Sequence, residues 1–199
     1  MKKLCTLLTL LFAFGLTYAQ EKKELTREET VNYLKKKFGE VNEQWIVENN
    51  GSKQFITGLY IGNKDSELNI TDRRKNKISN LSTSIDCGDW DKEQYYDFDP
   101  MQISDITDFA LTNEQSLGYL QIKLSSKTAK YRMVFKVVET RAGDRWECNY
   151  SATRNDDRNF TEYIYIPYLK TDPTNFNKLK KAFEHLKKLS SQSDDPFGN

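Results

Sequence analysis

One short segment, Asp86–Asp99, holds the largest concentration of side chains that can do chemistry. Asp89, Asp91 and Glu93 alternate along it, and Ca²⁺ prefers oxygen ligands such as carboxylates. The segment lacks the turn glycine and the distant bidentate glutamate of an EF-hand loop. The spacing leaves two interpretations, a calcium site and a solvated acidic loop, and we favour the loop.

Aromatic side chains interleave with these acids at Trp90, Tyr95, Tyr96 and Phe98. If they are exposed, they form a surface that binds carbohydrate, peptide or protein through ring stacking and apolar contact. If they are buried, they are ordinary sheet and core residues, which is the commoner outcome. A pair of the neighbouring carboxylates is also a candidate for the acid and the base of sugar hydrolysis, which requires a defined separation of the carboxyl groups.

The rest of the chain offers little catalytic chemistry. His185 is the single histidine, and it falls among lysines on a predicted C-terminal helix, away from the apolar stripe of that helix. We expect it to face solvent rather than to act as a general base or a metal ligand. The chain contains no Gly-rich phosphate loop, no Gly-x-Ser-x-Gly elbow and no His-Glu-x-x-His motif. The sequence therefore predicts a protein that is not an enzyme and that uses no cofactor.

The first residues have the pattern of a secretory signal peptide. Lys2 and Lys3 precede an apolar run over residues 4–16, and Ala19 offers a small residue for cleavage. The run is shorter than the about 20 residues that span a bilayer, and no later apolar run reaches that length. We expect residues 1–19 to be removed and the protein to be exported to the periplasm or the exterior, without a membrane span.

Two cysteines, Cys87 and Cys148, remain after removal of the signal peptide. In an oxidising compartment they can form one disulfide, and two buried free thiols are the alternative. A structural zinc site is not expected, because such sites use four Cys or His ligands.

The charge of the mature chain is close to neutral. Removing Lys2 and Lys3 from 30 basic residues leaves 28, against 29 acidic residues. A protein that binds nucleic acid without sequence preference has a strong excess of basic over acidic residues. We therefore expect no nucleic-acid partner.

Two helices are predicted, one near each end of the mature chain. The first, over residues 27–38, follows a capping box in which Thr26 and Glu29 each accept a hydrogen bond from the backbone amide of the other. Gly39 is expected to end this helix. Its apolar face consists of Val31, Leu34 and Phe38.

The second helix is predicted after Asp172, which caps it, with Pro173 in the first turn. Residues 190–199 show no periodicity and are expected to form a mobile tail. Apolar residues recur at helical spacing before that tail, at Phe176, Leu179, Ala182, Phe183, Leu186 and Leu189.

Between the helices the apolar pattern has a period of two, which is typical of an antiparallel sheet with one wet face. No βαβ rhythm appears, so a parallel α/β fold is not expected. The basic run Arg73–Lys77 and the polar cluster Asn155–Asp157 are interpreted as turns or loops. The predicted strands cover residues 54–61, 78–85, 101–106, 119–124, 131–137, 145–150 and 163–166.

The order of these elements, with the Ile103–Ile106 strand, the later meander and the Phe176–Leu189 helix, resembles pleckstrin-homology-like domains. The resemblance covers about residues 45–189 and implies a strongly bent antiparallel sheet or barrel with a C-terminal capping helix. The N-terminal helix is an addition to that fold, and the basic run at 73–77 matches no lipid-binding motif of the family. A lipocalin-like barrel is the alternative, although the Gly-x-Trp of lipocalins is missing.

We thus expect a single globular α+β domain over residues 20–189. The expected function is that of an exported, non-enzymatic binding or interaction module of the cell envelope, with a protein or a carbohydrate as its partner. A carrier of a small apolar ligand in a β-barrel and a carboxylate-dependent hydrolase are the alternatives.

Overall fold

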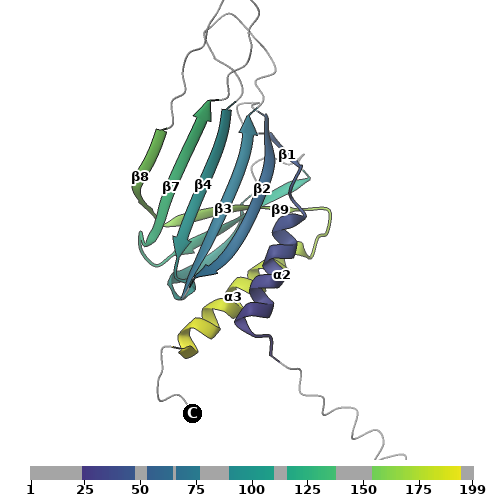
Figure 1. Ribbon diagram of the computed structural model, residues 1–199. Helices are drawn as coiled ribbons and strands as arrows, with labels where there is room; N and C mark the ends of the chain where they lie inside the picture. Colours follow the sequence, from purple (N-terminus) through teal and green to yellow (C-terminus); the bar gives the residue numbers. More distant parts are fainter. Residues whose placement is uncertain are drawn as a thin grey trace, which may run out of the picture.

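The computed structural model describes residues 24–47, 53–64, 66–76, 90–109, 116–137 and 154–193 (Figure 1). The predicted signal peptide, both candidate disulfide cysteines (Cys87 and Cys148), the metal candidate Asp89 and the predicted strands at 78–85 and 145–150 lie outside these residues. They stay predictions.

The N-terminal helix α2 (Arg27–Gly39) begins at the predicted capping box. The Thr26 hydroxyl accepts from the Glu29 amide at 3.2 Å, and the Glu29 carboxylate accepts from the Thr26 amide at 2.7 Å. Gly39 does not provide a left-handed stop, because it is the last helical residue and Glu40 after it keeps a right-handed φ of −66°. The left-handed position comes later, at Glu43 with φ 65°.

The C-terminal helix α3 (Asn175–Ser193) begins three residues after Asp172, so the prediction that Asp172 caps it and that Pro173 lies in its first turn is wrong. The Asp172 carboxylate instead accepts from the Thr174 amide at 2.8 Å, in the turn that precedes the helix. The helix runs four residues past the predicted end at Leu189. Ser190, predicted as the start of the tail, is buried and accepts from the Arg27 guanidinium at 2.6 Å. This contact between the two helices is not visible in the local periodicity, which is why the sequence predicted a shorter helix.

The described residues form nine β-strands, and every pairing between them is antiparallel. Their bounds are β1 (Trp45–Val47), β2 (Lys53–Lys64), β3 (Glu67–Asn76), β4 (Trp90–Phe98), β5 (Ile103–Phe109), β6 (Leu117–Leu124), β7 (Ala129–Val137), β8 (Arg154–Thr161) and β9 (Tyr163–Leu169). The large sheet has the order β1-β2-β3-β4-β7-β8, and the small sheet has the order β5-β6-β9.

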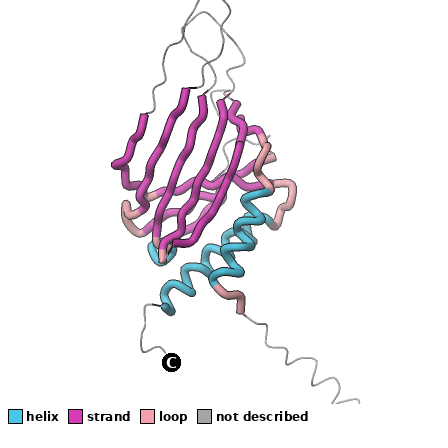
Figure 2. The backbone as a smooth tube through the Cα atoms, in the orientation of Figure 1, coloured by secondary structure: helices cyan, strands magenta, loops and turns pink. Residues whose placement is uncertain are grey.

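The chain passes three times between the two sheets. A 3₁₀ turn at Pro100–Gln102 joins β4 to β5, residues 125–128 join β6 to β7, and Glu162 joins β8 to β9. The amide of Leu124 donates to the Glu162 carbonyl at 2.8 Å, and the amide of Ser125 donates to the Gln102 carbonyl at 2.7 Å. These bonds hold the three crossings side by side, and the strands curl into an antiparallel half barrel with the helices at its lower end (Figure 2).

Four predicted strands are confirmed, those at 54–61, 119–124, 131–137 and 163–166. The strand predicted at 101–106 begins two residues late, after the 3₁₀ turn. Three predictions of loop or turn structure are wrong: Arg73–Asn76 belongs to β3, Trp90–Phe98 forms β4, and Asn155–Asp157 lies in β8. All three strands carry charged side chains, so they lack the apolar alternation by which strands are recognised.

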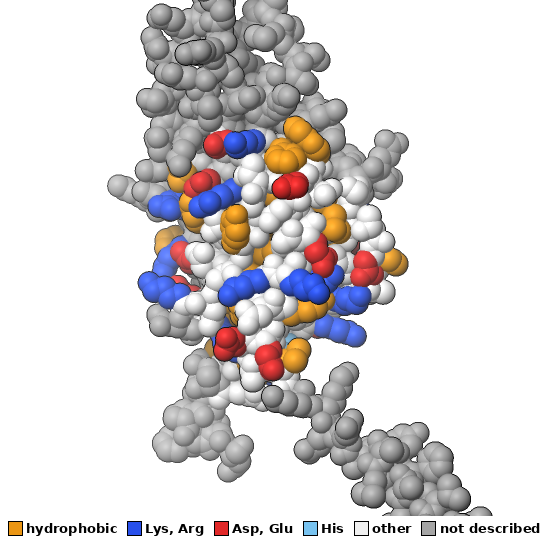
Figure 3. Space-filling view, turned by 45° about the vertical axis from the view of Figure 1, so that its right-hand side comes forward, with side chains coloured by type: hydrophobic (Ala, Val, Ile, Leu, Met, Phe, Trp, Pro, Cys, Tyr) orange, Lys and Arg blue, Asp and Glu red, His pale blue; other side chains and the backbone are white. Residues whose placement is uncertain are grey.

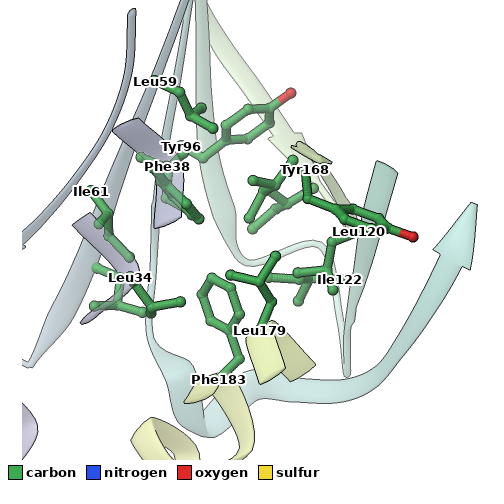
Figure 4. Close-up of a cluster of buried hydrophobic side chains, with 14 of the residues drawn as sticks. Leu34, Phe38, Leu59, Ile61, Tyr96, Leu120, Ile122, Tyr168, Leu179 and Phe183 are labelled. Carbon is green, nitrogen blue, oxygen red and sulfur yellow. The ribbon is translucent and has the colours of Figure 1, made fainter. Parts of the chain in front are cut away.

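The hydrophobic core lies between the lower part of the large sheet, one side of the small sheet and the two helices (Figure 4). Phe38 of α2 and Phe183 of α3 meet there with ring centroids 6.4 Å apart. Helix α3 contacts α2, β5 and β9 as well as the 3₁₀ turn. The prediction of a bent antiparallel sheet closed by a C-terminal helix is thus confirmed at the level of an α+β half barrel.

Candidate functional site

Residues Trp90–Phe98 of the acidic and aromatic segment form β4, a central strand of the large sheet. Its described carboxylates, Asp91, Glu93 and Asp97, alternate with the buried Tyr96 and Phe98 and therefore lie on the side of the strand that faces away from the core. Glu93 lies 3.4 Å from the Arg73 guanidinium, Asp97 accepts from the Asn69 amide, and Asp91 is opposite Lys75 and Lys136. Among the described residues, no three His, Cys, Asp or Glu side chains gather as a metal site would require. The calcium interpretation includes Asp89 and stays a prediction.

The aromatic side chains of β4 do not share one exposed surface. Tyr96 and Phe98 point inward and are buried, whereas Tyr95 points outward. Tyr95 donates a hydrogen bond to Glu93, which raises its pKa, and the Arg132 guanidinium lies 4.3 Å above its ring. Trp90 begins the strand opposite Asn76 and Val137.

The inner face of β3 carries a buried ion pair that the sequence did not reveal. Asp72 and Arg74 are 1% and 7% exposed, and the Arg74 Nε lies 2.9 Å from the Asp72 carboxylate. The Arg74 guanidinium also donates at 3.1 Å to the Gln54 carbonyl and at 3.1 Å to the Tyr119 hydroxyl. Burial alone would lower the pKa of Arg74, but Asp72 and Tyr119 raise it above its ordinary value. The guanidinium therefore stays charged and joins the large sheet to the small one.

Next to this ion pair, tyrosine hydroxyls and an amide form a second polar cluster. The Gln94 amide donates to the Tyr131 hydroxyl at 2.8 Å, and the Tyr96 and Tyr131 rings lie 5.1 Å apart. In Figure 4 the Tyr96 hydroxyl points away from the apolar core. Burial raises the pKa of Tyr96, and the groups of Tyr131, Asp72 and, from the small sheet, Tyr165 raise it further.

One side of the small sheet presents side chains from all three of its strands, and we name it the three-strand face. Gln121 lies opposite Thr107 on one neighbour and Tyr165 on the other. The Thr107 hydroxyl donates to the Gln121 carbonyl oxygen at 3.1 Å, and the Gln121 amide donates to the Tyr165 hydroxyl at 2.9 Å. The face consists of Asp105, Thr107, Phe109, Tyr119, Gln121, Lys123, Tyr163, Tyr165 and Pro167.

Two aromatic rings on this face touch each other and remain open to solvent. The centroids of Phe109 and Tyr165 are 5.6 Å apart at an angle of 64°, and the two side chains are 40% and 36% exposed. Along the same face exposure falls to 4% at Tyr119, which receives the hydrogen bond from Arg74. The side chains of Phe109, Gln121 and Tyr165, which we name the exposed row, thus lie on the same face as the buried Tyr119.

The other side of the small sheet is apolar and packs into the core through Leu120, Ile122, Ile164 and Ile166. The alternation in Tyr163-Ile164-Tyr165-Ile166 is the local signal that could have separated the two sides of this strand. The residues that complete the face, Phe109 and Gln121, come from strands up to 56 positions away (109 to 165) and could be grouped only with the register.

The three-strand face offers neutral hydrogen-bonding groups beside its rings. A glutamine amide has two N–H donors and a carbonyl with two lone pairs, and a tyrosine hydroxyl has one proton. Within the described residues, Gln121 uses one N–H for Tyr165 and one acceptor position for Thr107. One amide N–H and the Tyr165 hydroxyl proton are left to serve a ligand.

His185 was expected to face solvent, but its side chain is largely covered. Its side chain is only 19% exposed, and its Nε2 lies 2.7 Å from the Leu25 carbonyl oxygen. A surface pocket nearby is lined by Met101, Glu184, Lys187, Lys188 and Ser191. The Lys187 amine donates to the Ile103 carbonyl and the Lys188 amine to Glu24, both at 2.5 Å. Histidine and lysines here connect helix α3 to its neighbours.

No family model, no curated protein and no solved structure matches this chain. Among the residues described, no helix combines the length and the apolar character needed to cross a membrane.

Proposed function

We propose that this protein is an exported, non-enzymatic binding module of the cell envelope, and that it binds through the three-strand face. The observation that carries the proposal is the contact between two exposed rings, Phe109 and Tyr165, beside the hydrogen-bonded Gln121. Exposed aromatic rings are enriched where proteins bind partners, because they bury much area at a small cost in side-chain entropy.

The groups on this face favour binding over catalysis. Around Phe109, Gln121 and Tyr165 the face offers rings, an amide and hydroxyls, whereas acid–base catalysis needs groups that exchange protons near the working pH. The charged side chains of the face, Asp105 and Lys123, lie opposite each other at its other end. The ring of the single histidine, His185, contacts the Leu25 backbone on another part of the molecule. Export rests on the N-terminal sequence pattern, which resembles a signal peptide.

The interior of the half barrel supports a surface site rather than a carrier cavity. Leu34, Phe38 and Phe183 occupy the space between the sheets and are at most 1% exposed. The curled antiparallel sheet closed by α3 also supports the proposed likeness to pleckstrin-homology-like domains.

The test compares retention of cell-envelope components by three immobilised forms of the full mature chain. The site variant is Phe109→Ala/Tyr165→Ala. The matched control is Phe160→Ala/Tyr60→Ala, which removes one Phe and one Tyr that are 59% and 49% exposed on the outer face of the large sheet. We expect wild type and control to retain a component that the site variant loses. Equal retention by all three forms, or none by any of them, would contradict the proposal.

A further inference from the structure

We infer that the ligand of the three-strand face is a neutral polysaccharide. This inference rests on the proposed function and adds the chemical class of the ligand. It follows from three features of the face: its charge, the pairing of rings with hydrogen-bonding groups, and its size.

The exposed row carries no unbalanced charge that would select an ion. Phe109, Gln121 and Tyr165 are uncharged. The charged side chains of the face are Asp105 and Lys123, at the end of the face that includes Tyr163. There the Lys123 amine lies 3.7 Å from Glu162 and 5.9 Å from the centre of the Tyr163 ring. The Asp105 carboxylate accepts from the Ile106 amide at 2.8 Å. The broader surface is also mixed, since the side of the molecule in Figure 3 shows basic and acidic side chains interspersed.

A sugar ring has an apolar C–H face and a rim of hydroxyls that both donate and accept hydrogen bonds. The rings of Phe109 and Tyr165 meet at 64°, so they form an angled apolar surface on which such a ring can stack. Immediately beside them, Gln121 has a donor left over and Tyr165 has a hydroxyl proton. Stacking and hydrogen bonding are therefore available to the same ligand unit.

The geometry also suits more than one sugar unit. Tyr163 and Tyr165 lie two residues apart on one strand, so they share this face at a spacing of about 7 Å. Both are 36% exposed. A polymer lying along β9 can therefore contact successive rings, whereas a single sugar can contact only one end of the row.

The size of the face argues against a folded protein as the ligand. A standard protein interface uses about 20–30 residues on each side. Within the part of the chain that the structure describes, the three-strand face presents nine side chains, and two of them, Tyr119 and Pro167, are buried.

Hydrogen bonds hold the polar groups of Gln121 and Tyr165 in position before a ligand binds. Thr107 fixes the Gln121 amide, and Gln121 fixes the Tyr165 hydroxyl, all on paired strands. On the same face, the Tyr119 hydroxyl accepts a hydrogen bond from the Arg74 guanidinium at 3.1 Å. Such preorganisation lowers the entropy that binding would otherwise cost.

The experiment is affinity gel electrophoresis of the full mature chain in a panel of soluble neutral polysaccharides (β-glucan, mannan, xylan and galactan), with alginate as the anionic comparison. We expect at least one neutral polymer to retard the wild type and alginate not to. Phe109→Ala should raise the dissociation constant by about fivefold, since loss of a stacking ring removes on the order of 1 kcal/mol of binding free energy. Tyr165→Phe keeps the ring and should raise it less. The control Phe160→Ala should match the wild type.

The inference is overturned if no neutral polymer retards the protein, if alginate alone does, or if Phe109→Ala migrates like the wild type. A second arm separates this failure from failure of the proposed function. Envelope extract is treated either with periodate, which cleaves vicinal diols, or with a protease, and is then applied to the immobilised wild type. Retention that survives periodate and disappears with protease overturns the carbohydrate assignment but leaves a binding module. No retention from untreated extract overturns both.

Discussion

Strand β4 and the three-strand face contain similar side chains but expose them differently. Strand β4 lies between β3 and β7 in the large sheet, with Tyr96 and Phe98 buried on one side. On its other side Glu93 meets Arg73. In the three-strand face, Phe109 and Tyr165 come from the two outer strands of a small sheet and stay exposed.

The difference shows that the neighbours of a strand decide what its side chains can do. A central strand over a core has partners on both edges and on its inner face, so its rings become core and its charges become cross-strand pairs. Among the described residues, the helices pack against the apolar side of the small sheet, and its other side keeps Phe109, Tyr165 and the Gln121 amide available. A concentration of chemically capable residues along the chain is therefore a weaker sign of a binding site than their exposure together on one face.

The largest expected effect comes from breaking the link between the two regions. Arg74→Ala leaves the Asp72 carboxylate buried and unpaired and removes the hydrogen bond to Tyr119. The free energy of unfolding should fall by about 3–5 kcal/mol. Replacing both partners, as in Asp72→Leu/Arg74→Met, should cost clearly less, because no buried charge is left. Urea unfolding of both variants measures this, and a loss below about 1 kcal/mol for Arg74→Ala would disprove the structural role of the pair.

Two phenylalanine substitutions compare the regions directly. Phe98→Ala on β4 should lower the free energy of unfolding by about 3–5 kcal/mol, because it empties a core position that is 1% exposed. Phe109→Ala on β5 should change it by less than about 0.5 kcal/mol. Denaturant midpoints of the two variants give the comparison. Similar costs at both positions would mean that Phe109 is structural and would weaken its assignment to a binding surface.

Alkaline pH tests the burial of the inward side of β4. The pKa of Tyr96 is raised in the folded protein, whereas an unfolded tyrosine titrates near 10.0. The unfolded chain therefore loses this proton first, and the contribution of Tyr96 to stability is complete below pH 10 and declines as the pH rises further. The free energy of unfolding of Tyr96→Phe should decline less steeply above that pH than that of the wild type. Phe160→Ala, at an exposed ring that carries no titratable group, is the control, and its stability should decline with pH as that of the wild type does.

The smallest effect is expected on the outward side of β4. Glu93→Gln removes a partly exposed ion pair with Arg73 and should cost less than about 1 kcal/mol, a cost that shrinks at high salt. Melting temperatures at low and high salt measure it.

Calcium should leave the melting temperature of the wild type unchanged. A rise with calcium that Glu93→Gln abolishes would instead support the metal interpretation of Asp89, Asp91 and Glu93.

Much of the fold was predictable where the signal is local. The Thr26–Glu29 box is a short-range hydrogen-bond pattern, and α2 begins at it. The Asp172-Pro173 pattern located α3 less well, because the helix begins at Asn175, three residues after Asp172. The strands with apolar alternation, such as 119–124, were found because their signal is also local. Strands β3, β4 and β8 were missed because charged side chains interrupt that alternation, in β3 even on the inner face at Asp72 and Arg74.

The candidate site was predictable only in part. The pattern Tyr163–Ile166 already separates wet from buried positions on β9. The partners Phe109 and Gln121 join Tyr165 through strand pairing over long sequence distances, which no local pattern encodes. The segment around β4 attracted attention because its residue types are concentrated, and concentration along the chain carries no information about burial.

By itself, the amino-acid sequence determined the start of helix α2, the antiparallel character of the sheet and the amphipathic C-terminal helix, because each depends on residues within one or two turns or along one strand. Only the tertiary structure decided which aromatic rings are exposed and that Asp72 and Arg74 form a buried pair. Exposure and pairing depend on what the other sheet and the helices cover, and those contacts form between residues far apart in the chain.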